Sequence, residues 1–197
     1  RFDNVTGVQT CALPIYMRPS SPELARAFAD GVLSQGMDVI FLGLTSTDQL
    51  YFVSGDRDIP GAMFTASHNP AEYNGIKMCR SGARPVGQET GLADIVTNLV
   101  EKIPTYHGHS GELTEADTLA DYAAFLRKLV PLDDIRPLKV AVDAANGMAG
   151  HTVPEVFAGL PVTIEPLYFE LDGTFPNHEA NPLDPKNLSI IDRKSDV

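Results

Sequence analysis

Apolar residues between positions 17 and 111 alternate between helical spacing and short continuous runs. Leu24, Phe28 and Val32 recur at helical spacing and predict a helix. Ser20 or Ser21 would cap its start, and Gly36 would end it. Further patterns predict strands over residues 38–42 and 61–65, and helices over residues 46–54 and 92–103. This alternation of strands and helices predicts an α/β domain.

The same alternation returns after residues 104–111, a polar stretch that we interpret as a domain linker. The pattern there predicts a helix (116–130), a strand (138–143), a glycine-containing turn (144–150), a helix (151–158) and a strand (162–167). A strand–helix–strand order implies a right-handed crossover and a parallel pair. We therefore expect two consecutive three-layer α/β domains with mixed, largely parallel sheets, over residues 17–111 and 112–191.

The two ends of the chain read differently from its middle. Residues 1–16 show neither helical nor strand periodicity. Residues 192–197 interrupt a segment whose pattern is typical of the start of a helix. We interpret both as a non-native leader and tail and exclude them from the fold. On this interpretation the first domain lacks its N-terminal strand and the second is truncated, which predicts an unpaired sheet edge and marginal stability.

Charge and composition exclude several classes of protein. A net charge of −11 argues against a nucleic-acid binder, which normally carries a basic face. No apolar run is long enough to span a bilayer, so we expect no membrane association. Two cysteines, Cys11 and Cys79, make no disulfide framework, which favours a cytoplasmic protein, and Cys79 reads as a small buried hydrophobe. The sequence leaves the oligomeric state open.

Residues 65–70 (Thr-Ala-Ser-His-Asn-Pro) follow a predicted strand, where open α/β sheets place their ligands. Ser67 can carry a covalent group if its loop exposes the hydroxyl, and His68 can donate to a phosphate oxygen. Asn69 and Pro70 favour a turn, so a plain polar turn is the alternative.

A lysine returns toward this serine. Residues 73–77 (Tyr-Asn-Gly-Ile-Lys) contain an Asn-Gly turn and place Lys77 ten positions beyond Ser67. A hairpin would bring the ammonium over the serine, where it neutralises phosphate or exchanges a proton with a sugar hydroxyl. Taken alone, Lys77 reads as a solvated surface lysine.

Three segments together resemble the α-D-phosphohexomutase family. Residues 61–79 resemble its active-site segment, residues 18–21 (Arg-Pro-Ser-Ser) its upstream arginine motif, and residues 172–182 (beginning Asp-Gly-Thr-Phe-Pro-Asn-His) its second-domain loop. Tyr73 before Asn-Gly is similar to the phosphomannomutase/phosphoglucomutase branch. The alternatives that stay open are phosphoglucosamine mutase and a non-catalytic module that binds hexose phosphates.

The resemblance implies a reaction and residue roles. Ser67 would carry a phosphoryl group between the 6- and 1-positions of mannose or glucose phosphate, through a hexose 1,6-bisphosphate intermediate. His68 and Asn69 would hold the phosphoserine, Lys77 would act as acid, base or charge stabiliser, and Arg18 would support the loop or bind phosphate. Because the family's later loops do not occur before residue 197, we expect the chain alone to be inactive as a mutase.

Magnesium is the cofactor that the resemblance implies. The phosphate on Ser67 would be one ligand, and the acidic ligands are expected beyond the end of this chain. Asp143, at the end of a predicted strand, reads better as a turn or helix cap than as a ligand. The sequence Asp56-Arg57-Asp58 looks metal-like but reads as a solvated loop.

Overall fold

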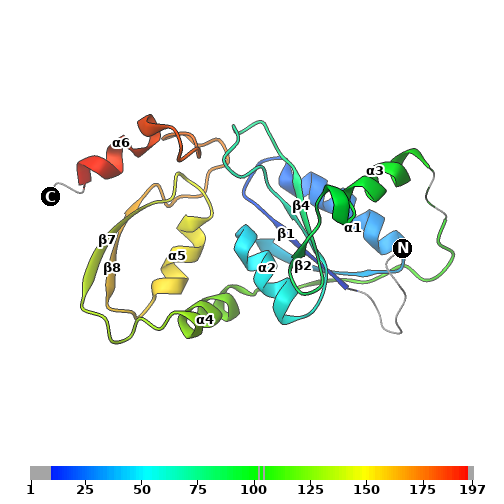
Figure 1. Ribbon diagram of the computed structural model, residues 1–197, viewed down its shortest axis with the longest axis horizontal. Coiled ribbons are helices and arrows are strands. Elements are labelled where there is room, and N and C mark those ends of the chain that lie inside the picture. Colours follow the sequence, from blue (N-terminus) through cyan, green and yellow to red (C-terminus); the bar gives the residue numbers. More distant parts are fainter. Residues whose placement is uncertain (1–9, 102, 104, 195–197) are drawn as a thin grey trace.

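The structure, a computed structural model, describes residues 10–101, 103 and 105–194 and contains two α/β domains (Figure 1). The first sheet has the strand order β5-β4-β3-β1-β2-β6. Its parallel strands are β1 (Thr10–Ile15), β2 (Asp38–Leu44), β3 (Gly61–Phe64) and β6 (Leu113–Glu115). Its antiparallel strands are β4 (Ile76–Arg80) and β5 (Arg84–Pro85). The predicted mixed, largely parallel sheet is confirmed.

The expectation that the first domain lacks its N-terminal strand is wrong. Residues 10–15 form β1, in the middle of the sheet between β3 and β2. Residues 11–15 form the same kind of continuous apolar run that predicted the other buried strands, but the run contains Pro14, which argues against a central strand, and it was excluded together with the leader. The run even tolerates Pro14, which sits where the register between β1 and β2 shifts. Residues 1–9 lie outside the described part of the chain.

Two helices cover opposite faces of this sheet and make the domain three-layered. Helix α1 (Ser21–Ser34) packs Ala25 and Ala29 into a cluster with Leu13 and Phe64, and the Phe28 ring meets the Phe64 ring edge-on at 5.7 Å. On the other face, α2 (Thr47–Asp56) packs against Met63, Ala12 and Leu42. The short helix η1 (Gln88–Thr90) and α3 (Leu92–Val100) follow β5 and bury none of their residues.

The first domain extends further along the chain than predicted. Strand β6 follows the expected boundary at residue 111, yet it pairs in parallel with β2. Two hydrogen bonds just before β6 hold the strand in place. The Glu112 amide donates to the Asp38 carboxylate at 2.8 Å, and the Gly111 amide donates to the Leu33 carbonyl at 2.9 Å. The boundary therefore lies after Glu115.

The second domain confirms the predicted strand–turn–helix–strand order. Strands β7 (Leu138–Asp143) and β8 (Val162–Leu167) pair in parallel, and α5 (Ala149–Phe157) connects them. Helix α4 (Leu119–Leu129) packs on α5, where Arg127 donates to the Val156 carbonyl at 2.9 Å. The last helix, α6 (Pro185–Lys194), continues past residue 191, where the predicted tail begins.

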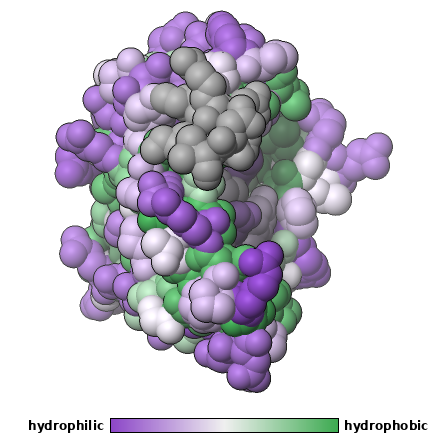
Figure 2. Space-filling model, turned by 90° about the vertical axis from the view of Figure 1, so that its left-hand side faces the viewer, coloured by the Kyte–Doolittle hydropathy of each residue, from purple (hydrophilic) through white to green (hydrophobic). Residues whose placement is uncertain are grey.

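The two domains meet along α2 and α4. The Phe52 ring lies 5.7 Å from that of Tyr122 and 5.1 Å from that of Phe125, and Gln49 donates to the Thr118 hydroxyl at 2.9 Å. The opposite end of the second domain, seen in Figure 2, shows apolar surface among polar side chains. None of the helices in the described residues is long and apolar enough to cross a membrane.

Candidate functional site

The loop between β3 and β4 presents Ser67 in an unusual backbone conformation. Its φ is +52°, a region that residues other than glycine rarely adopt, and its side chain is exposed. The buried Thr65 holds this conformation, because its hydroxyl accepts the Ser67 amide at 3.1 Å while its own amide donates to the Gly75 carbonyl at 2.9 Å. Backbone strain of this kind persists where surrounding contacts enforce it, often at functional sites.

His68 and Lys77 share a cavity with Ser67. The Ser67 Oγ lies 3.3 Å from the His68 Nδ1. Lys77 lies on β4 opposite Met63 of β3, so the predicted hairpin return is confirmed. All three line a cavity of about 740 Å³ between the two domains, whose far wall includes Asp143 and His178.

Arg18 lies beneath the Ser67 loop and binds its backbone. Its Nη1 donates to the Pro70 and Tyr73 carbonyls at 2.6 and 2.9 Å, and its Nη2 to the Ser67 and Asn69 carbonyls at 2.8 and 2.7 Å. These bonds engage all four terminal N–H groups, and the side chain is 1% exposed. Of the two roles predicted for Arg18, this arrangement favours loop support and leaves no terminal N–H for a phosphate.

Burial also affects the charge of Arg18. Desolvation lowers the pKa of its guanidinium, and the nearby Tyr16 and Glu72 partly offset that effect. The ring of Phe175, from the second domain, lies over the guanidinium with its centroid 5.3 Å from Cζ. Both aromatic and carbonyl groups thus replace water around this cation.

The serines after Arg18 also hold the loop, and although Ser20 has the predicted N-cap position of α1, its side chain does not cap the helix. Ser20 has helical backbone angles and makes no side-chain cap bond. Instead, the side-chain amide of Asn74 donates to the Ser20 and Ser21 hydroxyls at 2.9 and 3.0 Å, and Ser21 donates to the Phe64 carbonyl at 3.2 Å. Residues 18–21 therefore clamp both ends of the Ser67 loop.

Asn69 makes its side-chain hydrogen bond within the loop. Its side-chain nitrogen donates to the Ala66 carbonyl at 2.9 Å, and its backbone amide donates to the same oxygen at 3.1 Å. This closes the turn that the Asn-Pro pair predicted. A contact between Asn69 and phosphate stays a prediction.

A second polar pair faces the cavity from the other domain. The His178 Nε2 lies 3.1 and 3.0 Å from the two Asp143 carboxylate oxygens, and both side chains are largely buried. Asp143 also accepts the Ala145 amide at 2.8 Å, which fits the turn role predicted for it. Its pairing with His178 was not predicted, because a strand end and a loop 35 residues later meet only in the fold.

Both domains match models of one protein family. Residues 17–106 match the phosphoglucomutase/phosphomannomutase α/β/α domain I, and residues 120–195 match domain II of the same family. The chain belongs to the phosphoglucomutase/phosphomannomutase family. The resemblance carried by residues 18–21, 61–79 and 172–182 is thereby confirmed.

Curated relatives of the chain are named for one activity or the other. It is 38% identical to a phosphomannomutase of Escherichia coli over 179 residues, which cover 86% of this chain and 39% of that protein. It is 33% identical to a phosphoglucomutase of Neisseria meningitidis serogroup B, covering 94% of this chain and 40% of that protein. The chain thus spans about two fifths of the length of these relatives.

Solved structures of the family share this fold. A phosphoglucomutase/phosphomannomutase family protein from Burkholderia thailandensis superposes with a TM-score of 0.81 at 32% identity, covering 94% of this chain and 41% of that one. A protein titled a putative phosphomannomutase from Thermus thermophilus superposes with a TM-score of 0.76 at 24% identity, which shows the fold alone.

The residues present do not by themselves fit a magnesium site. Over the described ranges, no three His, Cys, Asp or Glu side chains gather closely enough to hold a metal ion. Asp56 and Asp58 are exposed at the end of α2, as the solvated-loop interpretation predicted. A magnesium ion bound through the phosphate of Ser67 stays a prediction.

Proposed function

We propose that this protein is a phosphohexomutase in which Ser67 carries the phosphoryl group. The observation that supports this most is the exposed Ser67 hydroxyl, held at positive φ beside His68 and sharing a cavity with Lys77. Membership of the family supports phosphoryl transfer as the chemistry of these three residues. Phosphoryl transfer depends mainly on positioning and on neutralising oxygen charge, which suits a rigid loop with a nearby ammonium group.

The step assigned to these residues is one half-reaction. The Ser67 oxygen attacks a phosphorus of a hexose 1,6-bisphosphate, the new Oγ–P bond forms, and the P–O bond to the sugar breaks. His68 Nδ1, 3.3 Å from Oγ, takes the serine proton, and Lys77 gives a proton to the leaving sugar oxygen. The reverse step, on a monophosphate bound the other way round, moves the phosphate between the 6- and 1-positions.

Lys77 has a second task in this proposal. Among the described residues that line the cavity, it is the one lysine or arginine, while Asp48, Asp143 and Glu179 are acidic. A phosphoryl group on Ser67 adds negative charge to a cavity that already holds three carboxylates, so Lys77 is the cation that stabilises it.

The proposed substrates are mannose and glucose phosphates, because the relatives are named for both sugars. A cytoplasmic location and a magnesium requirement of the whole enzyme belong to the same proposal.

The test is the rate of phosphoryl transfer to Ser67 from the 1,6-bisphosphates of glucose, mannose and glucosamine. We expect Lys77→Met and His68→Ala to slow it at least about a hundredfold, the usual size of an acid–base contribution. The control Lys128→Met removes an exposed lysine of α4 and should leave the rate of phosphoryl transfer unchanged. Equal rates in Lys77→Met and the unaltered chain would contradict the proposal, and a preference for the amino sugar would point to a phosphoglucosamine mutase.

A further inference from the structure

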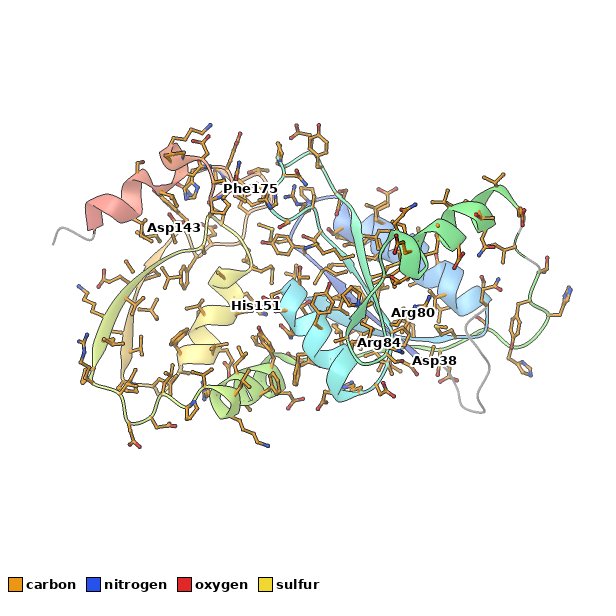
Figure 3. All side chains as sticks on the ribbon, viewed as in Figure 1. Asp38, Arg80, Arg84, Asp143, His151 and Phe175 are labelled. Atoms are coloured by element: carbon orange, nitrogen blue, oxygen red, sulfur yellow. The ribbon has the colours of Figure 1, made fainter. Side chains whose placement is uncertain are left out.

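A turn of the second domain lies directly on the arginine that supports the Ser67 loop. Asp172 accepts the Phe175 amide at 3.1 Å through its carbonyl, which brings Phe175 to the end of the turn (Figure 3). The Phe175 ring then covers the Arg18 guanidinium, with 5.3 Å between Cζ and the ring centroid. Phe175 is 8% exposed and Gly173 is buried as well, whereas Thr174 between them faces solvent.

The contact is close along the backbone as well. A Cβ added at Gly173 would lie 2.5 Å from the Met17 carbonyl oxygen, 2.8 Å from Pro19 Cδ and 3.2 Å from Arg18 Cα. The first two distances are shorter than real Cβ contacts, so only glycine lets the turn approach residues 17–19 this closely. The turn therefore packs on the arginine motif itself.

Phe175 holds a conformation that bulky side chains rarely adopt. Its φ is +53°. Asn146 ties the turn to the rest of the second domain, because its backbone carbonyl accepts the Asp172 amide at 3.0 Å and its side-chain oxygen accepts the Asn177 side chain at 2.8 Å. Contacts at both ends of the turn thus hold Phe175 in its strained backbone conformation, with its ring facing the buried guanidinium.

Arg18 depends on this cover. Its Nε is buried and has no hydrogen-bond partner within the described residues, while its four terminal N–H groups all go to loop carbonyls. Water at this cation would compete with those carbonyls, and the ring both excludes water and attracts the guanidinium.

We propose that Phe175 is a positioning residue for the phosphoryl-carrying serine, acting from the second domain through Arg18. The inference rests on the proposed function for its catalytic consequence. The ring keeps Arg18 desolvated and seated, Arg18 keeps four carbonyls of residues 67–73 in place, and the loop keeps Ser67 at positive φ. Docking of the second domain thereby sets the conformation of the serine in the first.

The experiment compares amide hydrogen exchange of residues 65–75 in the complete 197-residue chain and its variants. Phe175→Leu keeps an apolar cover but loses the ring, and we expect exchange in the loop to rise roughly three- to thirtyfold. Phe175→Tyr keeps the ring face and should restore slow exchange. Exchange in β7 and β8 should stay unchanged, which separates positioning from unfolding of the second domain.

Three further variants test whether the effect comes from the contact with Arg18. Gly173→Ala should lift the turn from Arg18 and raise loop exchange, whereas Gly31→Ala, where an added Cβ meets nothing within 4 Å, should not. Phe157→Leu makes the same side-chain change on α5, away from Arg18, and should leave the loop unaffected. The proposal is overturned if Phe175→Leu leaves loop exchange unchanged, or if Phe157→Leu raises it equally.

A second readout separates this proposal from the proposed function. Phe175→Leu should lower the maximal rate of phosphoryl transfer to Ser67 without changing the bisphosphate concentration that gives half of that rate, because the ring does not line the cavity. If neither chain takes up phosphate, the proposed function fails, and loop exchange still decides the positioning role. A higher half-saturating concentration with an unchanged maximal rate would overturn it.

Discussion

The Nη2 of Arg18 donates to the Ser67 carbonyl oxygen at 2.8 Å, across 49 positions of sequence. A buried cation thus fixes the backbone of the residue that we propose as the phosphoryl carrier. The contact runs to the main chain, so the Ser67 hydroxyl stays free to react in the cavity. Residues 18–21 therefore belong to the site although none of them lines the cavity with Ser67.

Arg18→Lys should destabilise the protein. An ammonium group cannot reach four carbonyls arranged around a planar guanidinium, so at least one of these charge-assisted hydrogen bonds is lost. We expect the free energy of unfolding in urea to fall by roughly 1.5–3 kcal/mol. Arg26→Lys, at an exposed position of α1, is the matched control and should have almost no effect.

Asn74→Ala should loosen the return of the loop. It removes the donor to the Ser20 and Ser21 hydroxyls, for a loss of about 1–2 kcal/mol of stability. Limited proteolysis should then cut first between residues 66 and 75. Asn98→Ala on the exposed face of α3 should leave the cleavage pattern unchanged, and an uncut loop in Asn74→Ala would contradict the clamp.

Much of this arrangement followed from the sequence. The Asn-Gly turn predicted the return of Lys77, and apolar runs predicted β2, β3, β7 and β8, because such signals are local. The bonds of Ser20 and Ser21 were misread as a helix cap, since the competing partner, Asn74, lies more than 50 residues away. Strand β1 was missed for a related reason. Its apolar run contains Pro14, which by itself argues against a central strand, and only the pairing with β2 and β3 shows that the sheet accommodates the proline where the register shifts.

The two cysteines should be inert in the folded protein. Burial raises the pKa of the Cys11 thiol to about 12, with nearby Cys79 adding to the effect, and both side chains are almost inaccessible. At pH 8 a thiol-specific disulfide reagent should label neither residue within minutes and both after unfolding in urea. Rapid labelling of the native chain would show that β1 does not lie in the centre of the sheet.

The turn that carries Phe175 should weaken in acid. Hydrogen bonds from the Thr174 hydroxyl and amide lower the pKa of Asp172 below its usual value. The carboxylate therefore stabilises the turn above the unfolded-state pKa, and this contribution is lost as pH falls through the lower, folded-state pKa. Thr174→Val removes the hydroxyl and should move the Asp172 pKa upward, toward its ordinary value, in a carboxyl NMR titration. An unchanged titration would contradict the hydrogen bond.

The most direct test of the account is the mass of the intact chain after incubation with glucose 1,6-bisphosphate. We predict the addition of one phosphoryl group, located on Ser67 by peptide mapping and absent from Ser67→Ala, while Ser81→Ala, in the turn between β4 and β5, is labelled normally. We also predict no repeated interconversion of hexose monophosphates by this chain alone. A folded chain that takes up no phosphate, or takes it up equally in Ser67→Ala, would contradict the assignment of Ser67 as the phosphoryl carrier.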